Sequence, residues 1–95
     1  MKVYKRRPGV VLVEICGESM LIATGDARDH CPYVTQVNQA AARWWTLLDE
    51  GATLPGLVEK AGERFGQMGG NPVFAALQFI VKMQDAGYLL AVDEP

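Results

Sequence analysis

Residues 32–51, PYVTQVNQAAARWWTLLDEG, predict a strand that runs into a helix with almost no loop between them. Residues 33–37 alternate, and they are rich in the β-branched and aromatic residues that strands favour. Asn38 then offers a side-chain oxygen to the free N–H groups of a helix that begins at Gln39. We therefore expect this strand, tied rigidly to one core helix, to organise the rest of the chain.

The helix predicted over residues 39–50 carries both tryptophans of the chain on one wide apolar face. Polar residues recur at i, i+4, i+7 and i+11 on the opposite face, as in an amphipathic helix with one solvent-exposed side. Gly51 follows, where a left-handed C-cap residue is favoured. The apolar face comprises Ala41, Trp44, Trp45, Leu47 and Leu48.

Two more strands are predicted before this segment, VVLVEIC at residues 10–16 and SMLIAT at residues 19–24. Gly17-Glu18 lies between them, and a two-residue connection that contains glycine is a strong hairpin signal. Residues 24–31 show neither strand nor helix periodicity and are predicted to form a mobile loop. The three short strands are expected to form an antiparallel sheet with at least one unpaired edge.

Two further helices are predicted after Gly51, each from an N-cap residue with a proline in the first turn. Thr53 begins the first, over residues 54–65, and Asn71 begins the second, over residues 72–86, with Gly87 as its C-cap. GQMGG at residues 66–70 is expected to be a flexible break. Tyr88, Leu89 and Leu90 are expected to form a short extended tail, either a strand or a flap over the core. The basic residues 1–7 and the last residues, 91–95, are expected to be flexible and solvated.

The last predicted helix is unusually apolar. Its core side is expected to carry Val73, Ala76, Leu77, Phe79, Ile80 and Met83. A narrow polar stripe is formed by Gln78, Lys82 and Asp85. Phe74 and Val81 lie beside this stripe, where an apolar shoulder is either packed under a strand or open to a ligand.

The length and the order of the predicted elements indicate a single α+β domain over residues 1–95, and the composition argues against several classes of function. The formal net charge of −2 is the wrong sign for a generic nucleic-acid binder. The chain has no apolar run near the ~20 residues of a membrane span and no secretion signal, so we expect a cytoplasmic protein without a membrane partner. It has one histidine and no nucleophile elbow or glycine-rich phosphate loop, which predicts no enzyme activity and no cofactor. Cys16 and Cys31 are expected to be reduced, semi-buried thiols, and no metal-ligand spacing accompanies them.

The predicted order of three strands and three helices, together with the join VTQVNQAAARWWTLLDEGATLPGLVEKAGERFG, resembles PqqD-type proteins. These are peptide chaperones that serve radical-SAM and related maturation enzymes of ribosomal peptides, and the wider class is called the RiPP recognition element. The match covers residues 8–90. It implies a winged-helix-like domain with a three-stranded antiparallel sheet followed by a three-helix bundle.

The resemblance also implies a site. In the family, the leader of a precursor peptide adds as a fourth strand on the third strand, in the groove between that strand and the third helix. Strand addition of this kind uses backbone hydrogen bonds for affinity and pockets for alternate side chains. The implied peptide-binding residues are Tyr33, Val34, Thr35, Gln36, Val37, Phe74, Leu77, Gln78, Val81 and Lys82. Whether the pathway is PQQ biosynthesis or another ribosomal-peptide pathway stays open.

We therefore expect a non-enzymatic adaptor that presents a leader peptide to a maturation enzyme, as a monomer or a weak homodimer. The alternative is a winged-helix DNA-binding transcriptional regulator with its third helix in the major groove. That helix exposes one cation and one anion in its polar stripe, whereas a helix facing phosphates is expected to carry more Arg and Lys. A third alternative is a dimerisation module in which the open sheet edge pairs with itself.

Overall fold

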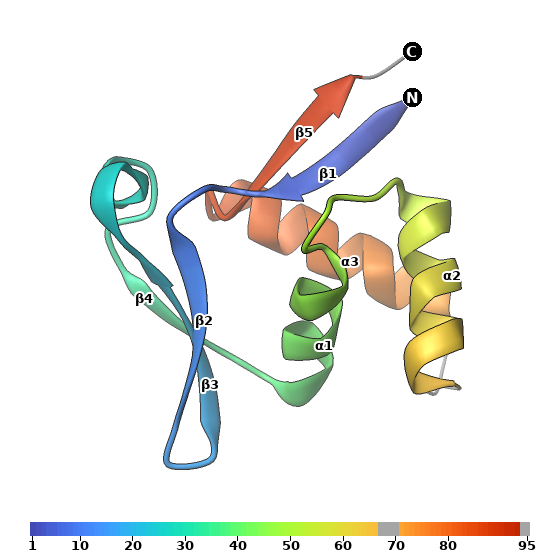
Figure 1. Cartoon of the computed structure of the whole chain (residues 1–95), viewed down its shortest axis with the longest axis horizontal. Helices are drawn as coiled ribbons and strands as arrows, with labels where there is room; N and C mark the ends of the chain where they lie inside the picture. Colours follow the sequence, from blue (N-terminus) through green and yellow to red (C-terminus); the bar gives the residue numbers. More distant parts are fainter. Residues whose placement is uncertain (67–70, 94–95) are drawn as a thin grey trace.

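The computed structural model describes residues 1–66 and 71–93 and has α+β architecture (Figure 1). A three-stranded antiparallel sheet is followed by three helices, as predicted, and a separate two-stranded pair joins the two ends of the chain. The predicted break at residues 66–70 lies, apart from Gly66, outside the described residues. The elements are β1 (Lys2–Arg6), β2 (Val10–Ile15), β3 (Glu18–Ala23), a 3₁₀ helix η1 (Gly25–Asp29), β4 (Val34–Val37), α1 (Gln39–Leu47), α2 (Leu54–Phe65), α3 (Pro72–Asp85) and β5 (Leu89–Asp93).

The three-stranded sheet has the order β2-β3-β4, so β3 is central. In the β2–β3 hairpin Ile15 pairs with Glu18, which places the two-residue turn at Cys16-Gly17 and not at the predicted Gly17-Glu18. Cys16 has φ 53° and Gly17 has φ 79°. Positive φ at both central residues is the type I′ geometry, whose twist matches that of the flanking strands.

The turn predicts that Cys16→Asn stabilises the protein by about 0.5–1 kcal/mol, because asparagine tolerates positive φ better than cysteine. Urea denaturation would measure the difference. Cys16→Val is the matched control and is expected to destabilise, since a β-branched side chain is strained at this φ. A Cys16→Asn variant no more stable than the wild type would contradict the assigned turn geometry.

The first residues do not form the predicted solvated tail. β1 pairs with β5 in antiparallel register from Lys2 opposite Asp93 to Arg6 opposite Leu89. On its other side, Tyr4 exchanges two backbone hydrogen bonds with Ala52, at 2.8 and 3.0 Å. Tyr88, which follows α3, is fully buried in the core, and β1 pairs with one edge of β5, the next strand. The two ends of the described chain therefore lie side by side (Figure 1).

The core lies between the helices and the inner face of the sheet. Asn38, Thr53 and Asn71 cap the three helices as predicted, each accepting a hydrogen bond from a first-turn N–H group. α1 ends at Leu47, earlier than expected, and its C-cap is Leu48, so Gly51 does not cap the helix. Gly51 has φ +82°, and a side chain at this position would meet β1. The buried helical residues are Trp44, Trp45, Leu47, Leu57, Ala61, Ala76, Phe79, Ile80 and Met83.

Residues 24–31 contain the 3₁₀ helix η1, where the sequence predicted a loop. Ala27 and Cys31 anchor this segment in the core, and the Cys31 thiol donates to the Ala27 carbonyl at 3.3 Å. Both cysteines are free, but neither is semi-buried as expected, since Cys16 is exposed and Cys31 is buried. No helix in the described part of the chain is long and apolar enough to cross a membrane.

Candidate functional site

β4 is an edge strand with a groove along its open side. It pairs with β3, and within residues 1–66 and 71–93 no strand pairs with its other side. A groove of about 280 Å³ runs between β4, the start of α1 and the facing side of α3. It is lined by Thr35, Gln36, Val37, Asn38, Ala40, Ala41, Trp44, Ala75, Gln78, Phe79, Lys82 and Met83.

Side chains alternate along β4 between the groove side and the outer face of the sheet. Thr35 pairs with the fully buried Leu21, so it shares the inner face of the sheet with Val37, two residues on. Val34 lies on the outer face and is 59% exposed. Of the five predicted strand residues, Thr35, Gln36 and Val37 line the groove, and Tyr33 and Val34 do not.

Two tyrosines tie the beginning of β4 to the end of α3. The rings of Tyr33 and Tyr88 meet edge to face at 5.9 Å. The Tyr88 hydroxyl donates to the Tyr33 carbonyl at 3.2 Å and lies 2.6 Å from the Thr35 hydroxyl. The Tyr33 hydroxyl donates to the carbonyl of Ala86, the C-cap residue of α3. These contacts hold β4 at a fixed distance from α3, and sequence reasoning missed Tyr88 because it assigned this residue to a tail.

Burial raises the pKa of the Tyr88 phenol above 10.0 and that of the Cys31 thiol above 9.0. Both groups ionise more readily in the unfolded chain, so their contribution to stability is complete below about pH 8 and is lost as the pH rises. We expect the free energy of unfolding to fall between pH 8.5 and pH 11. Tyr88→Phe should lower stability by about 1–2 kcal/mol at pH 7 and should make this alkaline loss shallower. Denaturant titrations across this pH range would measure both effects, and an unchanged alkaline slope in the variant would contradict the assignment.

The predicted α3 residues divide between two faces of the helix. Gln78 and Lys82 line the groove beside β4. The same two residues, with Leu77, Val81 and Asp85, also line a shallow hollow on the outer face. Phe74 lines neither the groove nor this hollow.

Exposure corrects part of the predicted core. Val73 and Leu77, which were expected inside, are 50% and 43% exposed. α3 buries only the side that carries Ala76, Phe79, Ile80 and Met83, so apolar residues on its other side stay uncovered. Phe74 and Val81 are 59% and 50% exposed, so no strand of the described residues covers this shoulder.

The groove is suited to binding an extended chain. Its floor includes the buried Trp44, Phe79 and Met83, and its rim carries the exposed Gln36, Asn38, Gln78 and Lys82. Nowhere in the described residues do three or more His, Cys, Asp or Glu side chains gather as a metal site would need. Apolar depressions beside an unpaired strand can take alternate side chains of an added strand, while the rim amides offer hydrogen bonds.

No protein-family model, no curated protein and no solved structure matches this chain.

Proposed function

We propose that this protein is a cytoplasmic, non-enzymatic peptide-binding adaptor. It binds the leader of a precursor peptide as an added strand on β4 and presents it to a modifying enzyme, of the radical-SAM type or a related one. The observation that supports this proposal is the open edge of β4 beside an apolar-floored groove. The edge supplies hydrogen-bonding groups, and the groove supplies contacts for side chains.

The dimensions of a β-sheet agree with this placement. A strand added to β4 lies about 4.8 Å from it, and its side chains point alternately to the two faces of the sheet. Those on the inner face enter the groove above Trp44 and Phe79. Those on the outer face lie next to Val34, which is exposed. Both sets of side chains then meet apolar surface, which favours a leader segment rich in apolar residues.

The exposed face of α3 supports peptide binding over DNA binding. A helix that enters the major groove presents polar and basic side chains to bases and phosphates. α3 instead exposes four apolar side chains and one cation, Lys82. The apolar set is Val73, Phe74, Leu77 and Val81.

The test is NMR mapping on ¹⁵N-labelled protein. The probes are synthetic copies of short peptides encoded beside the gene, together with peptides selected from a phage-displayed random library. We expect saturable amide shifts that cluster on β4, on the start of α1 and around Gln78 and Lys82. Binding with shifts confined to other surfaces would overturn the β4 site. Sequence-specific binding of duplex DNA with a steep salt dependence would overturn the adaptor proposal in favour of a regulator.

A further inference from the structure

β2 is the second open edge of the three-stranded sheet. It pairs with β3, and none of the other described segments pairs with its outer side. In a hairpin with a two-residue turn, Ile15 and Glu18 exchange hydrogen bonds, so the backbone groups of Ile15 point toward β3. Along an antiparallel strand, the backbone groups of successive residues point alternately to the two sides. The N–H and C=O groups of Leu12 and Glu14 therefore point away from β3, toward the open edge.

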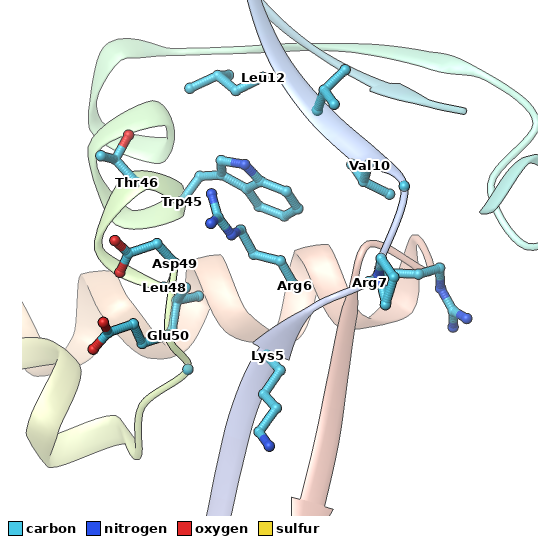
Figure 2. A pocket seen from close by; sticks show the side chains of 14 residues that line it. Lys5, Arg6, Arg7, Val10, Leu12, Trp45, Thr46, Leu48, Asp49 and Glu50 are labelled. Atoms are coloured by element: carbon cyan, nitrogen blue, oxygen red, sulfur yellow. The ribbon is translucent and has the colours of Figure 1, made fainter. Parts of the chain in front are cut away.

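A hollow of about 750 Å³ lies beside this edge, bounded by the end of β1, the first half of β2 and the end of α1 (Figure 2). Val10 and Leu12 line it from β2, Trp45 from α1, and Leu48 from the C-cap position after α1. Arg6 reaches into the hollow and lies over the Trp45 ring, 5.6 Å from its centroid. The lining thus combines an apolar wall with three cations, Lys5, Arg6 and Arg7, and two carboxylates, Asp49 and Glu50.

Two opposite charges at this edge form no ion pair within the residues that the structure describes. Arg6 is half-buried, and among the described residues no carboxylate forms an ion pair with it. Glu14 is exposed, breaks the otherwise apolar run VVLVEI, and forms no ion pair in the same part of the chain. Asp49 and Glu50 also line the hollow, but they come from the turn that follows α1, across from β2 (Figure 2).

We propose that two copies of this chain associate through their β2 edges, with Glu14 of each copy entering the hollow of the other and pairing with its Arg6. The strands pair antiparallel about a twofold axis, so the same surface is used on both copies. For the two β2 strands to form hydrogen bonds, the outward-pointing N–H and C=O groups of one copy must lie opposite those of the other. A twofold axis that passes through Leu12 or through Val13 meets this condition. In these two registers Glu14 of the second copy falls opposite Val10 or Leu12, and both of these residues line the hollow.

The charge pattern favours a second copy over an unrelated strand. In a twofold dimer Arg6 and Glu14 both gain an ion-pair partner, because each copy supplies one guanidinium and receives one carboxylate. On the outer face, the apolar Val11, Val13 and Ile15 of one copy meet the same set of residues on the other. Such cross-strand apolar pairs stabilise a sheet.

The association is expected to be reversible and to leave the peptide site open. Pairing of two short strands buries less than the ~800 Å² per partner of a standard stable interface. The result is a sheet with three strands from each copy and β4 at both ends. This proposal does not depend on the adaptor function, since β4 stays free.

Sedimentation velocity over a wide range of protein concentrations tests the proposal. Wild type is expected to show a monomer–dimer equilibrium. Arg6→Glu and Glu14→Arg should each raise the dissociation constant at least about tenfold, because each removes two charge-assisted contacts per dimer and places like charges together. The double variant Arg6→Glu with Glu14→Arg should restore dimerisation to within about threefold of wild type. Arg43→Glu is the matched control, because Arg43 also lies over an aromatic ring, that of Phe65, at 5.3 Å, but outside the hollow.

Thermal melts show whether each variant is folded, and Arg6→Gln replaces Arg6→Glu if the latter unfolds. A monomer at every accessible concentration would overturn the proposal. A dimer that is unaffected by Arg6→Glu and by Glu14→Arg but is lost in Leu77→Glu would place the interface on α3 and would also overturn the proposal. A dimer weakened by both single changes and not recovered by the double swap would refute the Arg6–Glu14 pairing.

Discussion

Replacing Trp45 with alanine is expected to lower the free energy of unfolding by about 3–5 kcal/mol. The indole is 1% exposed and belongs to the core cluster that α1, α2, α3 and the sheet share. Its removal leaves a cavity that the surrounding helices cannot close, and it also removes the ring on which Arg6 lies. For a domain whose total stability is about 5–15 kcal/mol, this is a large fraction.

Urea denaturation followed by circular dichroism would measure the change. The matched control is Thr46→Ala at the next, exposed position, where only a hydrogen bond from the hydroxyl to the Ala42 carbonyl is lost. That variant should stay within about 0.5 kcal/mol of wild type. If Trp45→Ala cost less than about 1.5 kcal/mol, Trp45 would not be the core anchor that its burial indicates.

Local signals in the sequence predicted the helices well because capping is a local interaction. Asn38, Thr53 and Asn71 each bond an N–H group only two or three residues away, so the pattern in the sequence is the cause of the structure. The same holds for the join between β4 and α1, where strand residues and a cap follow directly. The α+β class and the order of the sheet and helices could be predicted from these signals.

β1 could not be predicted in this way, because its partner lies at the other end of the chain. The segment KVYKR pairs with Leu89–Asp93, and nothing within its own five residues separates such a strand from a basic tail. The turn at Cys16-Gly17 was placed one residue too late for a related reason. Glycine marks a hairpin, but the register of the strands decides which two residues form the turn.

In the candidate site, too, some residues could be predicted from the sequence and others could not. Thr35, Gln36, Val37, Gln78 and Lys82 were expected from the family resemblance, and they line the groove together. Helical periodicity shows which residues share a face of α3, but it does not show which face another element covers. That is why Val73 and Leu77 were wrongly assigned to the core. Tyr88, Ala75 and Phe79 contribute to β4 and its groove only through tertiary packing.

The Gln78→Trp variant is expected to lower the affinity for the bound peptide by at least about tenfold, while the melting temperature stays near that of wild type. Gln78 is exposed and lines the groove between α3 and β4, so an indole at this position occupies space that an added strand needs. Because the side chain is on the surface, the change creates no core cavity and should alter stability by no more than about 0.5 kcal/mol. Isothermal titration calorimetry with a peptide that binds the wild type would measure the loss.

The matched control for Gln78→Trp is Gln84→Trp, the same substitution on the same helix, because Gln84 is exposed and does not line the groove. It should leave affinity within about twofold of wild type. Val81→Ser then distinguishes binding in the groove from binding at the outer hollow of α3, since Val81 lines the hollow and not the groove. Loss of affinity in Gln78→Trp alone would confine the peptide to the groove, and loss in both Gln78→Trp and Val81→Ser would extend its contacts to the apolar outer face. Normal affinity in Gln78→Trp would show that the peptide does not bind in the β4 groove, because a strand added at this edge would collide with the indole.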